Sequence, residues 1–235
     1  NNFDYSKYIK NNQLIICYNK EHIQFLLSIL EQTRVINQFH TFIENYIFFL
    51  QDYIDIPNIV QNTINQIICN TSTITGAGAI IAENDIKNLP YIIKDKGVIE
   101  IKDLFKNKPA IIIASAPTVT ELLPQLLDKK IRDNIIIIAI AQMLRPLLAF
   151  GIKPDFICTV DYGEINFEHF SGLWYIDDIP LVALNRSYAD ILEKWRGSKF
   201  IVSNGNPIID DKTVTEMIVK KGVLEQGGSV AHMAI

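Results

Sequence analysis

Residues 111–123 read IIIASAPTVTELL, a run of β-branched residues that stops at a short turn and continues into a segment with the composition of a helix. An apolar run followed at once by a turn and a helix is the first half of a strand–helix–strand unit. The turn itself has two interpretations. Thr118 and Glu121 have the spacing of a capping box, which satisfies free amides at a helix start. Alternatively, the amides of this corner bind a phosphate, as helix N-termini do.

The rhythm of this stretch repeats along the C-terminal half of the chain. Short apolar runs alternate with helical stretches, which is typical of a parallel sheet covered on both faces. We expect strands at Ala110–Ala114, Ile135–Ala139, Phe156–Val160, Leu181–Leu184 and Phe200–Val202. We expect helices between them at Thr118–Asp128, Met143–Phe150 and Tyr188–Trp195. The sequence therefore predicts a parallel α/β domain over residues 108–235.

The N-terminal part has a different texture. Between Asn19 and Cys69, apolar residues recur every three or four positions, the spacing of amphipathic helices. We expect a mainly helical domain over residues 1–75 and a helical connector over residues 76–107. The composition of Thr71–Gly78, TSTITGAG, predicts a loop, and Pro90 predicts a kink or a break in the helix that follows. In that helix we expect Ile86, Leu89 and Ile93 to share the apolar side.

Composition argues against several classes of protein. The chain has 235 residues, a net charge of −4 and no block of Lys and Arg, so we expect neither nucleic acid nor a membrane surface as a partner. No apolar run approaches the roughly 18 residues of a spanning helix, and no signal peptide is visible. The three cysteines are widely spaced and form no CxxC pair, so we expect no zinc site and no disulfide framework. A cytoplasmic location is the expectation.

Candidate site residues come from the strand ends, because ligands of open parallel sheets bind beyond the carboxyl ends of the strands. Asp161 follows the third predicted strand, where an aspartate binds ribose hydroxyls, holds a metal, acts as a base or caps a loop. Glu164 and His169 follow soon after and are candidates for acid–base chemistry, although His169 also suits a helix surface. Arg186 follows the fourth strand and suits a phosphate or a sugar carboxylate. No Walker-type or GxSxG motif is present.

The remaining candidates are polar or small residues able to hold a nucleotide at the strand ends. Gln142 bonds a base or a sugar, or caps a helix. Ser229 follows two glycines whose backbone allows close approach of a ligand. The predicted binding set is Ser115, Ala116, Pro117, Thr118, Gln142, Asn185, Gly228 and Ser229.

Three segments together resemble a known family in order and spacing: NKPAIIIASAPTVTELLPQL, LRPLLAFGIKPDFICTVDYGEINFEHF and GGSVAHMAI. They are similar to the central domain of the motility accessory factors, bacterial flagellin glycosyltransferases that share this domain with archaeal pterin pyrophosphokinases. The resemblance covers about Leu89–Ile235. It implies a Rossmann-like domain similar to that of bacterial sialyltransferases, preceded by the family's variable N-terminal domain.

The resemblance also implies an activity and roles for individual residues. Family members are thought to transfer a nonulosonic acid, of pseudaminic or legionaminic type, from a CMP-activated donor to Ser or Thr of flagellin. Asp161 and Glu164 match the family's acidic strand end, and Ser229 matches its glycine–serine loop. The family pattern Gly-x-Gly-Pro-Ser-Leu corresponds to Ala114–Val119, so both glycines are alanine here. Each adds a Cβ where backbone would approach a phosphate.

Three functions follow as hypotheses. The first is a cytoplasmic glycosyltransferase that uses a CMP-activated sugar, requires no metal or cofactor, and deprotonates the acceptor with a carboxylate or histidine. The second is a Mg²⁺-dependent pterin pyrophosphokinase, with Asp161, Glu164 and Asp155 as carboxylates. The third is a non-catalytic nucleotide- or flagellin-binding module, which the two lost glycines favour.

Overall fold

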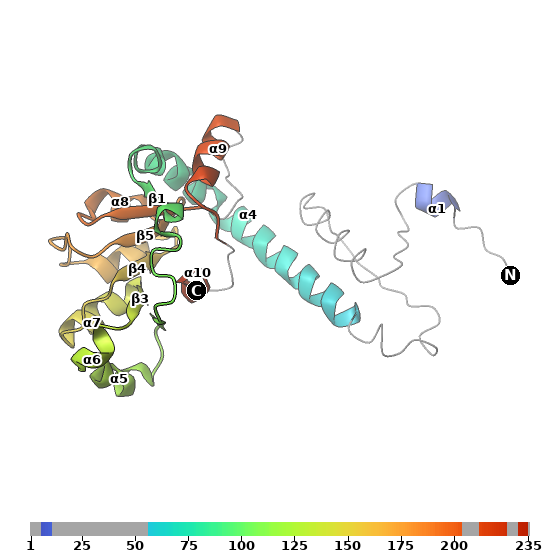
Figure 1. Cartoon of the computed structure of the whole chain (residues 1–235). Helices are drawn as coiled ribbons and strands as arrows, with labels where there is room; N and C mark the ends of the chain where they lie inside the picture. Colours follow the sequence, from blue (N-terminus) through green and yellow to red (C-terminus); the bar gives the residue numbers. More distant parts are fainter. Residues whose placement is uncertain (1–5, 11–55, 204–211, 225–229, 235) are drawn as a thin grey trace, which may run out of the picture. The chain divides into compact units, whose positions relative to one another are not determined.

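The computed structural model describes residues 6–10, 56–203, 212–224 and 230–234. The chain forms two compact units, Asn1–Ala77 and Gly78–Ile235. In the first unit the described residues are helix α1 (Ser6–Lys10) and the first part of helix α4 (Ile56–Lys94), which continues into the second unit (Figure 1). The predicted helical character of residues 11–55 stays a prediction, because residues 11–55 lie outside the described ranges. The predicted domain boundaries also stay predictions.

The second unit is built on a parallel sheet of six strands in the order β1-β6-β5-β4-β3-β2 (Figure 1). The strands are β1 (Lys96–Gly97), β2 (Ala110–Ile113), β3 (Ile136–Ile140), β4 (Phe156–Thr159), β5 (Leu181–Leu184) and β6 (Lys199–Val202). All five predicted strands are confirmed, each within one residue at either end. The two-residue strand β1 was not predicted; it extends the sheet beyond β6. The result is a Rossmann-like α/β fold.

Short helices connect the strands. They are η1 (Val98–Ile101), α5 (Val119–Leu122), η2 (Leu123–Leu127), α6 (Lys129–Arg132), η3 (Ala141–Met143), α7 (Leu144–Ala149), η4 (Glu164–Phe170), α8 (Ala189–Lys194), α9 (Lys212–Lys220) and α10 (Val230–Ala234). The helix predicted at Thr118–Asp128 is divided into α5 and the 3₁₀ helix η2. Pro124 lies in the first turn of η2, where a residue without an amide hydrogen is tolerated.

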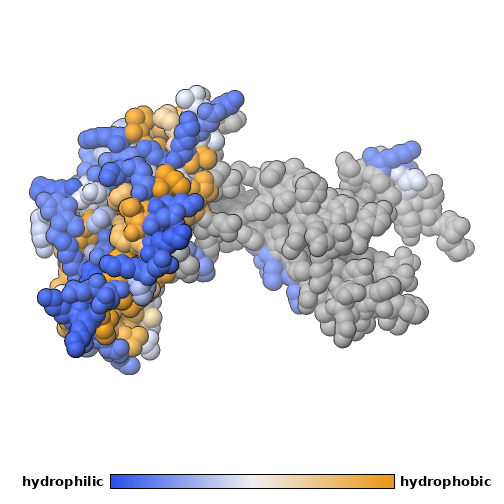
Figure 2. Space-filling model, in the orientation of Figure 1, coloured by the Kyte–Doolittle hydropathy of each residue, from blue (hydrophilic) through white to orange (hydrophobic). Residues whose placement is uncertain are grey.

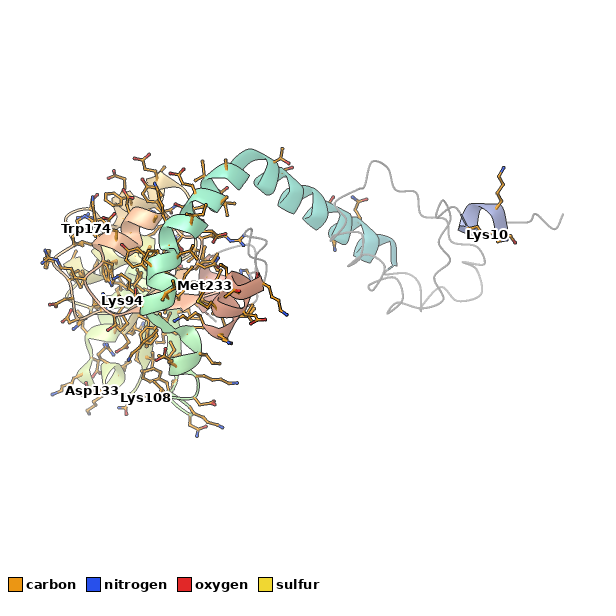
Figure 3. The ribbon with its side chains drawn as sticks, turned by 90° about the horizontal axis from the view of Figure 1, so that it is seen from above. Lys10, Lys94, Lys108, Asp133, Trp174 and Met233 are labelled. Atoms are coloured by element: carbon orange, nitrogen blue, oxygen red, sulfur yellow. The ribbon has the colours of Figure 1, made fainter. Side chains whose placement is uncertain are left out.

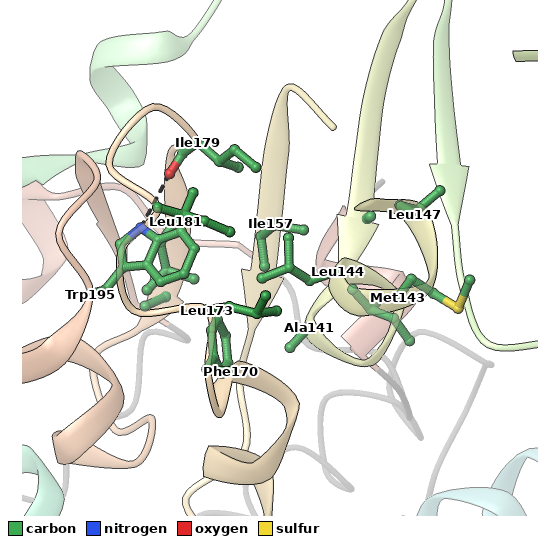
Figure 4. Packing of buried hydrophobic residues seen from close by; sticks show 14 of the residues in the cluster. Ala141, Met143, Leu144, Leu147, Ile157, Phe170, Leu173, Ile179, Leu181 and Trp195 are labelled. Carbon is green, nitrogen blue, oxygen red and sulfur yellow. Dashed lines mark hydrogen bonds between the residues drawn. The ribbon is translucent and has the colours of Figure 1, made fainter. Parts of the chain in front are cut away.

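Side chains alternate between the two faces of the sheet, so each strand contributes to two cores. Ile157, Leu181 and Ala183 belong to the larger core, on the face covered by the connecting helices. Strands β2 to β6 are added in sequence order, and right-handed crossovers then place their connections on the same face. In Figure 4, Phe170 and Trp195 pack together in this core, and the Trp195 indole N–H donates to the carbonyl of Ile179 at 3.2 Å.

The second face is covered by smaller elements. Cys158 and Val182 point to this face and pack with Met233 and Ala234 of α10. Phe105 adds an edge-to-face contact to Phe156, with ring centroids 5.6 Å apart. Several large apolar side chains remain exposed near this face, and Figure 2 shows such residues interspersed with hydrophilic ones. Scattered exposed apolar residues are ordinary on a protein surface.

Helix α4 corrects two expectations. It runs without interruption through Thr71–Gly78, so the loop predicted there is wrong. A glycine inside a helix costs about 1 kcal/mol relative to alanine, which the hydrogen bonds and contacts of a long helix can offset. A break at Pro90 does not occur, because the helix continues to Lys94, and Pro90 itself is exposed. The kink that Pro90 predicts stays a prediction. Seen from above, the end of α4 at Lys94 lies in front of the rest of the second unit (Figure 3).

The buried side of α4 is also different from the expected one. Ile86 and Ile93 are 60% and 63% exposed, so the prediction that they form the apolar side is wrong. The buried side carries the polar residues Asn84, Asp85 and Asn88 instead. In the described part of the chain, no helix is long and apolar enough to cross a membrane.

Candidate functional site

A small pocket lies at the carboxyl ends of β3 and β4, the edge where the sequence placed the site. Its volume is about 20 Å³, room for a water molecule or for one substituent of a ligand. Apolar and polar residues both line it. The lining residues are Ile140, Ala141, Gln142, Cys158, Thr159, Asp161, Asn166, His169 and Val230.

Asp161 and His169 are the carboxyl and imidazole groups among the residues that line the pocket. Asp161 is exposed as a residue, but partial burial of its carboxyl group raises its pKa, and the charge of His169 acts in the opposite direction without cancelling the rise. The Asp161 carbonyl accepts a hydrogen bond from the Tyr188 amide at 3.0 Å, so its main chain is fixed. A carboxylate of raised pKa beside an imidazole is suited to proton transfer.

Gln142 and Asn166 complete the polar rim. Gln142 belongs to η3, directly after β3, and its exposed side chain is available to a ligand. The Asn166 amide donates to the carbonyl of Gly163 at 3.1 Å and closes the turn that begins η4. The structure thus brings together Gln142, Asp161 and His169 from the predicted set, and it adds Asn166.

The corner after β2 stands apart from this pocket. Ser115, Ala116, Pro117 and Thr118 are exposed, and none of them lines the pocket. The predicted capping box is wrong, because the Thr118 side chain makes no cap hydrogen bond. Thr118 has helical dihedrals, φ −78° and ψ −10°, whereas a capping hydroxyl needs an extended residue. The phosphate-binding role of this corner stays a prediction.

The other predicted residues are distributed as follows. Glu164 is exposed at the start of η4 and does not line the pocket. Asn185 is completely buried, and its side chain is directed to α4. Gly228 and Ser229 lie outside the described residues, although the next residue, Val230, lines the pocket.

A buried polar network beside the pocket was missed from the sequence. The structure describes seven buried polar residues, and all of them lie at strand ends or on the facing side of α4. They are Asn84, Asp85, Asn88, Thr159, Asn185, Ser187 and Ser203. The available signal was the run of positions 81, 84, 85, 88 and 92, which share one helical face with isoleucine at both ends.

Hydrogen bonds join α4 to the loop after β5. The Asn88 amide donates to the carbonyls of Asn185 and Ser187 at 2.9 and 2.7 Å. The Asn185 amide donates to a carboxylate oxygen of Asp85 at 2.6 Å. The two Asn88 bonds satisfy main-chain carbonyls of the loop after β5, as buried backbone requires.

The network and the pocket both fall inside one region of similarity to known proteins. A family model described as 6-hydroxymethylpterin diphosphokinase MptE-like matches residues 83–235. The chain belongs to the MptE-like family. No curated protein and no solved structure matches the chain. The match to the MptE-like domain starts at Glu83, one residue before Asn84, so it contains the polar side of α4 together with the sheet.

Two charged residues of the MptE-like domain, Arg186 and Asp155, lie away from solvent to different degrees and have charged neighbours. Burial lowers the pKa of the Arg186 guanidinium, and Asp85 opposes that effect through its charge. Asp155 accepts from the Ile137 amide at 2.8 Å and from Arg132 at 3.0 Å. Because Asp155 directly precedes β4, it lies at the amino edge of the sheet, opposite the pocket. The proposed role of Asp155 as a third site carboxylate is therefore wrong.

Two observations concern metal binding and thiol reactivity at the pocket. Among the described residues, no three His, Cys, Asp or Glu side chains are grouped as they would be to hold a metal ion. Burial raises the pKa of the Cys158 thiol to about 12, which keeps it neutral and unreactive.

Proposed function

We propose that the chain is a glycosyltransferase that moves a nonulosonic acid from a CMP-activated donor to a Ser or Thr hydroxyl of flagellin. The observation that carries the proposal is the position of Asp161 and His169 on the rim of one pocket, at the carboxyl edge of a parallel sheet. Ligands of such sheets bind at this edge. The sequence resemblance to the motility accessory factors supplies the donor and acceptor class.

In the proposed reaction, Asp161 takes the proton of the acceptor hydroxyl. The hydroxyl oxygen then attacks the anomeric carbon of the sugar, and the bond from that carbon to the CMP phosphate oxygen breaks. The electron pair of the broken bond leaves with CMP. The raised pKa of Asp161 suits a general base, because a base of higher pKa accepts a proton more readily. His169 lines the pocket, where its imidazole is able to donate a hydrogen bond to the leaving phosphate as that group gains negative charge.

A second candidate is a Mg²⁺-dependent diphosphokinase that transfers the terminal diphosphate of ATP to a pterin alcohol. The description of the matching family favours it. Mg²⁺ is held by one or two carboxylates together with substrate phosphates. Asp161 alone among the three carboxylates considered lines the pocket, since Glu164 is outside the lining and Asp155 is at the opposite edge. We therefore place glycosyl transfer first.

The two functions differ in ligand and product, so one set of assays separates them. The chain is incubated with CMP, CDP, UDP or ATP, with and without Mg²⁺, and the unfolding temperature is measured. Release of CMP from a CMP-nonulosonic acid in the presence of flagellin is then compared with release of AMP from ATP in the presence of 6-hydroxymethylpterin.

Stabilisation by CMP and flagellin-dependent CMP release that Asp161→Asn abolishes would support the transferase. Stabilisation by ATP alone, with Mg²⁺-dependent AMP release, would overturn it in favour of the diphosphokinase. Nucleotide binding without either product would indicate the non-catalytic binding module.

A further inference from the structure

The loops that follow β4 and β5 are joined directly at the candidate base. The Tyr188 amide donates to the carbonyl of Asp161 at 3.0 Å, and the Ser187 hydroxyl donates to the carbonyl of Thr159 at 3.1 Å. The position of Asp161 therefore depends on the loop that leads from β5 into α8. Neither loop belongs to the sheet ladder, so other contacts must hold them.

Asn84 of α4 contacts both loops with one side chain. Its amide nitrogen donates to the carbonyl of Tyr162 at 2.9 Å, and its amide oxygen accepts from the Ala189 amide at 3.3 Å. Asn84 is only 4% exposed, so water competes little for these bonds. The Asn84 carboxamide thus joins the carbonyl of Tyr162, the residue after Asp161, to the amide of Ala189, the first residue of α8.

The neighbouring side chains of α4 perform a different task. The described hydrogen bonds of Asn88 and Asp85 go to the loop after β5, at Asn185 and Ser187. The opposite side of the helix faces solvent, where Glu83 and Lys87 form an exposed ion pair at 2.8 Å. Within the described hydrogen bonds of this helix side, Asn84 is the residue that reaches the Asp161 loop.

We propose that Asn84 is a positioning residue of the site, which holds the Asp161–Tyr162 main chain so that the Asp161 carboxylate faces the pocket beside His169. The inference rests on the proposed function for the reaction that Asp161 serves, but its geometry does not depend on which reaction that is. Asn84 touches no pocket atom itself and acts through the Tyr162 carbonyl.

The test compares Asn84→Ala with Asn88→Ala. Each removes a buried asparagine from the same side of the same helix, and each deletes two hydrogen bonds. Urea unfolding gives the stability of both variants. The pKa of the Asp161 carboxyl group is measured by carbon NMR titration, with Asp161→Asn used to assign the signal. This titration needs no substrate.

We expect both variants to lose similar stability. Asn84→Ala should return the Asp161 pKa further towards its ordinary value than Asn88→Ala does, because the freed loop gives the partly buried carboxyl group more contact with water. In the transfer assay, Asn84→Ala should lower kcat about tenfold with little change in KM, since a misplaced base affects the reacting state more than substrate binding. Asn88→Ala should shift the Asp161 titration less, because Asn88 bonds the Asn185 and Ser187 carbonyls and not the Asp161 loop itself.

Equal effects of the two variants on the Asp161 pKa, or none from Asn84→Ala, would overturn the proposal. If Asn84→Ala does not fold, the same comparison is made with Asn84→Ser and Asn88→Ser, which keep a hydroxyl in the buried space. A selective change in the titration without any CMP release from the natural chain would refute the glycosyltransferase while leaving the positioning role intact.

Discussion

The Asn185 side-chain amide donates to the Asp85 carboxylate at 2.6 Å, across 100 positions of sequence. Both residues are completely buried, so the bond joins the end of a strand to a helix inside the protein. The bond connects α4, near the start of the region that the family model matches, to the end of β5 in the middle of the sheet. A hydrogen bond to a charged group in such surroundings contributes more than an exposed one.

We predict that Asp85→Ala lowers the free energy of unfolding by about 2–3 kcal/mol, because the Asn185 amide loses its acceptor inside the protein. Urea unfolding monitored by circular dichroism measures the change. Asp177→Ala removes an exposed carboxylate and serves as control, with an expected change within about 0.5 kcal/mol. Similar values for the two variants would contradict the network.

Two glycines are predicted to respond to alanine in opposite directions. A Cβ at Gly97 would lie 2.4 Å from the Lys221 carbonyl oxygen, so Gly97→Ala should destabilise the second unit by about 1–3 kcal/mol. A Cβ at Gly76 meets nothing within 4 Å, and Gly76 is helical, so Gly76→Ala should stabilise α4 by about 1 kcal/mol. Thermal unfolding and far-UV circular dichroism report both. No gain of helicity from Gly76→Ala would speak for a loop at Thr71–Gly78.

Substitutions of Asp155 and Asp161 are predicted to have different effects: the first lowers stability, and the second abolishes transfer. Asp155→Ala removes the acceptor of the Ile137 amide and of Arg132, so it should cost about 1–3 kcal/mol and leave CMP affinity unchanged. Asp161→Asn should leave the fold intact and abolish transfer. Calorimetric titration with CMP, together with urea unfolding, makes the comparison. A loss of CMP binding in Asp155→Ala, at a concentration where it is folded, would place the ligand at the other edge of the sheet.

The raised pKa of Asp161 predicts a pH dependence of stability. The folded state holds the Asp161 proton more tightly than the unfolded state, so the folded chain is relatively less stable once that proton is lost. This loss of stability is absent at pH values below the ordinary aspartate pKa, and it reaches its full size at pH values above the raised pKa of the folded state. Asp161→Asn should therefore stabilise the chain at neutral pH, and the advantage should vanish in acid. Urea unfolding at several pH values tests it, and a constant difference between the two proteins would exclude this origin.

Some parts of the fold could be read from local sequence. Strands β2 to β6 are short apolar runs bounded by turn residues, and burial on both faces leaves few other structures for such runs. Gln142, Asp161 and His169 were expected near one another for the same reason, since parallel strands bring their carboxyl ends to one edge, and all three line one pocket. Their role in a reaction stays a prediction. The prediction of their shared location needed the strand pattern alone.

The side of α4 that is buried could not be predicted in this way. Ile86, Leu89 and Ile93 have helical spacing, and so do Ile81, Asn84, Asp85, Asn88 and Ile92. Hydrophobicity favours the first set, yet Ile86 and Ile93 are exposed. The second set is buried because the loops after β4 and β5 present carbonyl and amide groups that need partners.

The sequence by itself therefore determined the parallel sheet and the edge at which the polar strand ends of the candidate site meet, because these follow from periodicity within short segments. Tertiary structure alone decided how that site is held. Asn84 and Tyr162 are 78 positions apart, and no local pattern reveals that the carbonyl after Asp161 takes its hydrogen bond from a helix preceding the sheet. Pairing of buried polar groups is set by which segments meet in space, and that is known only once the chain has folded.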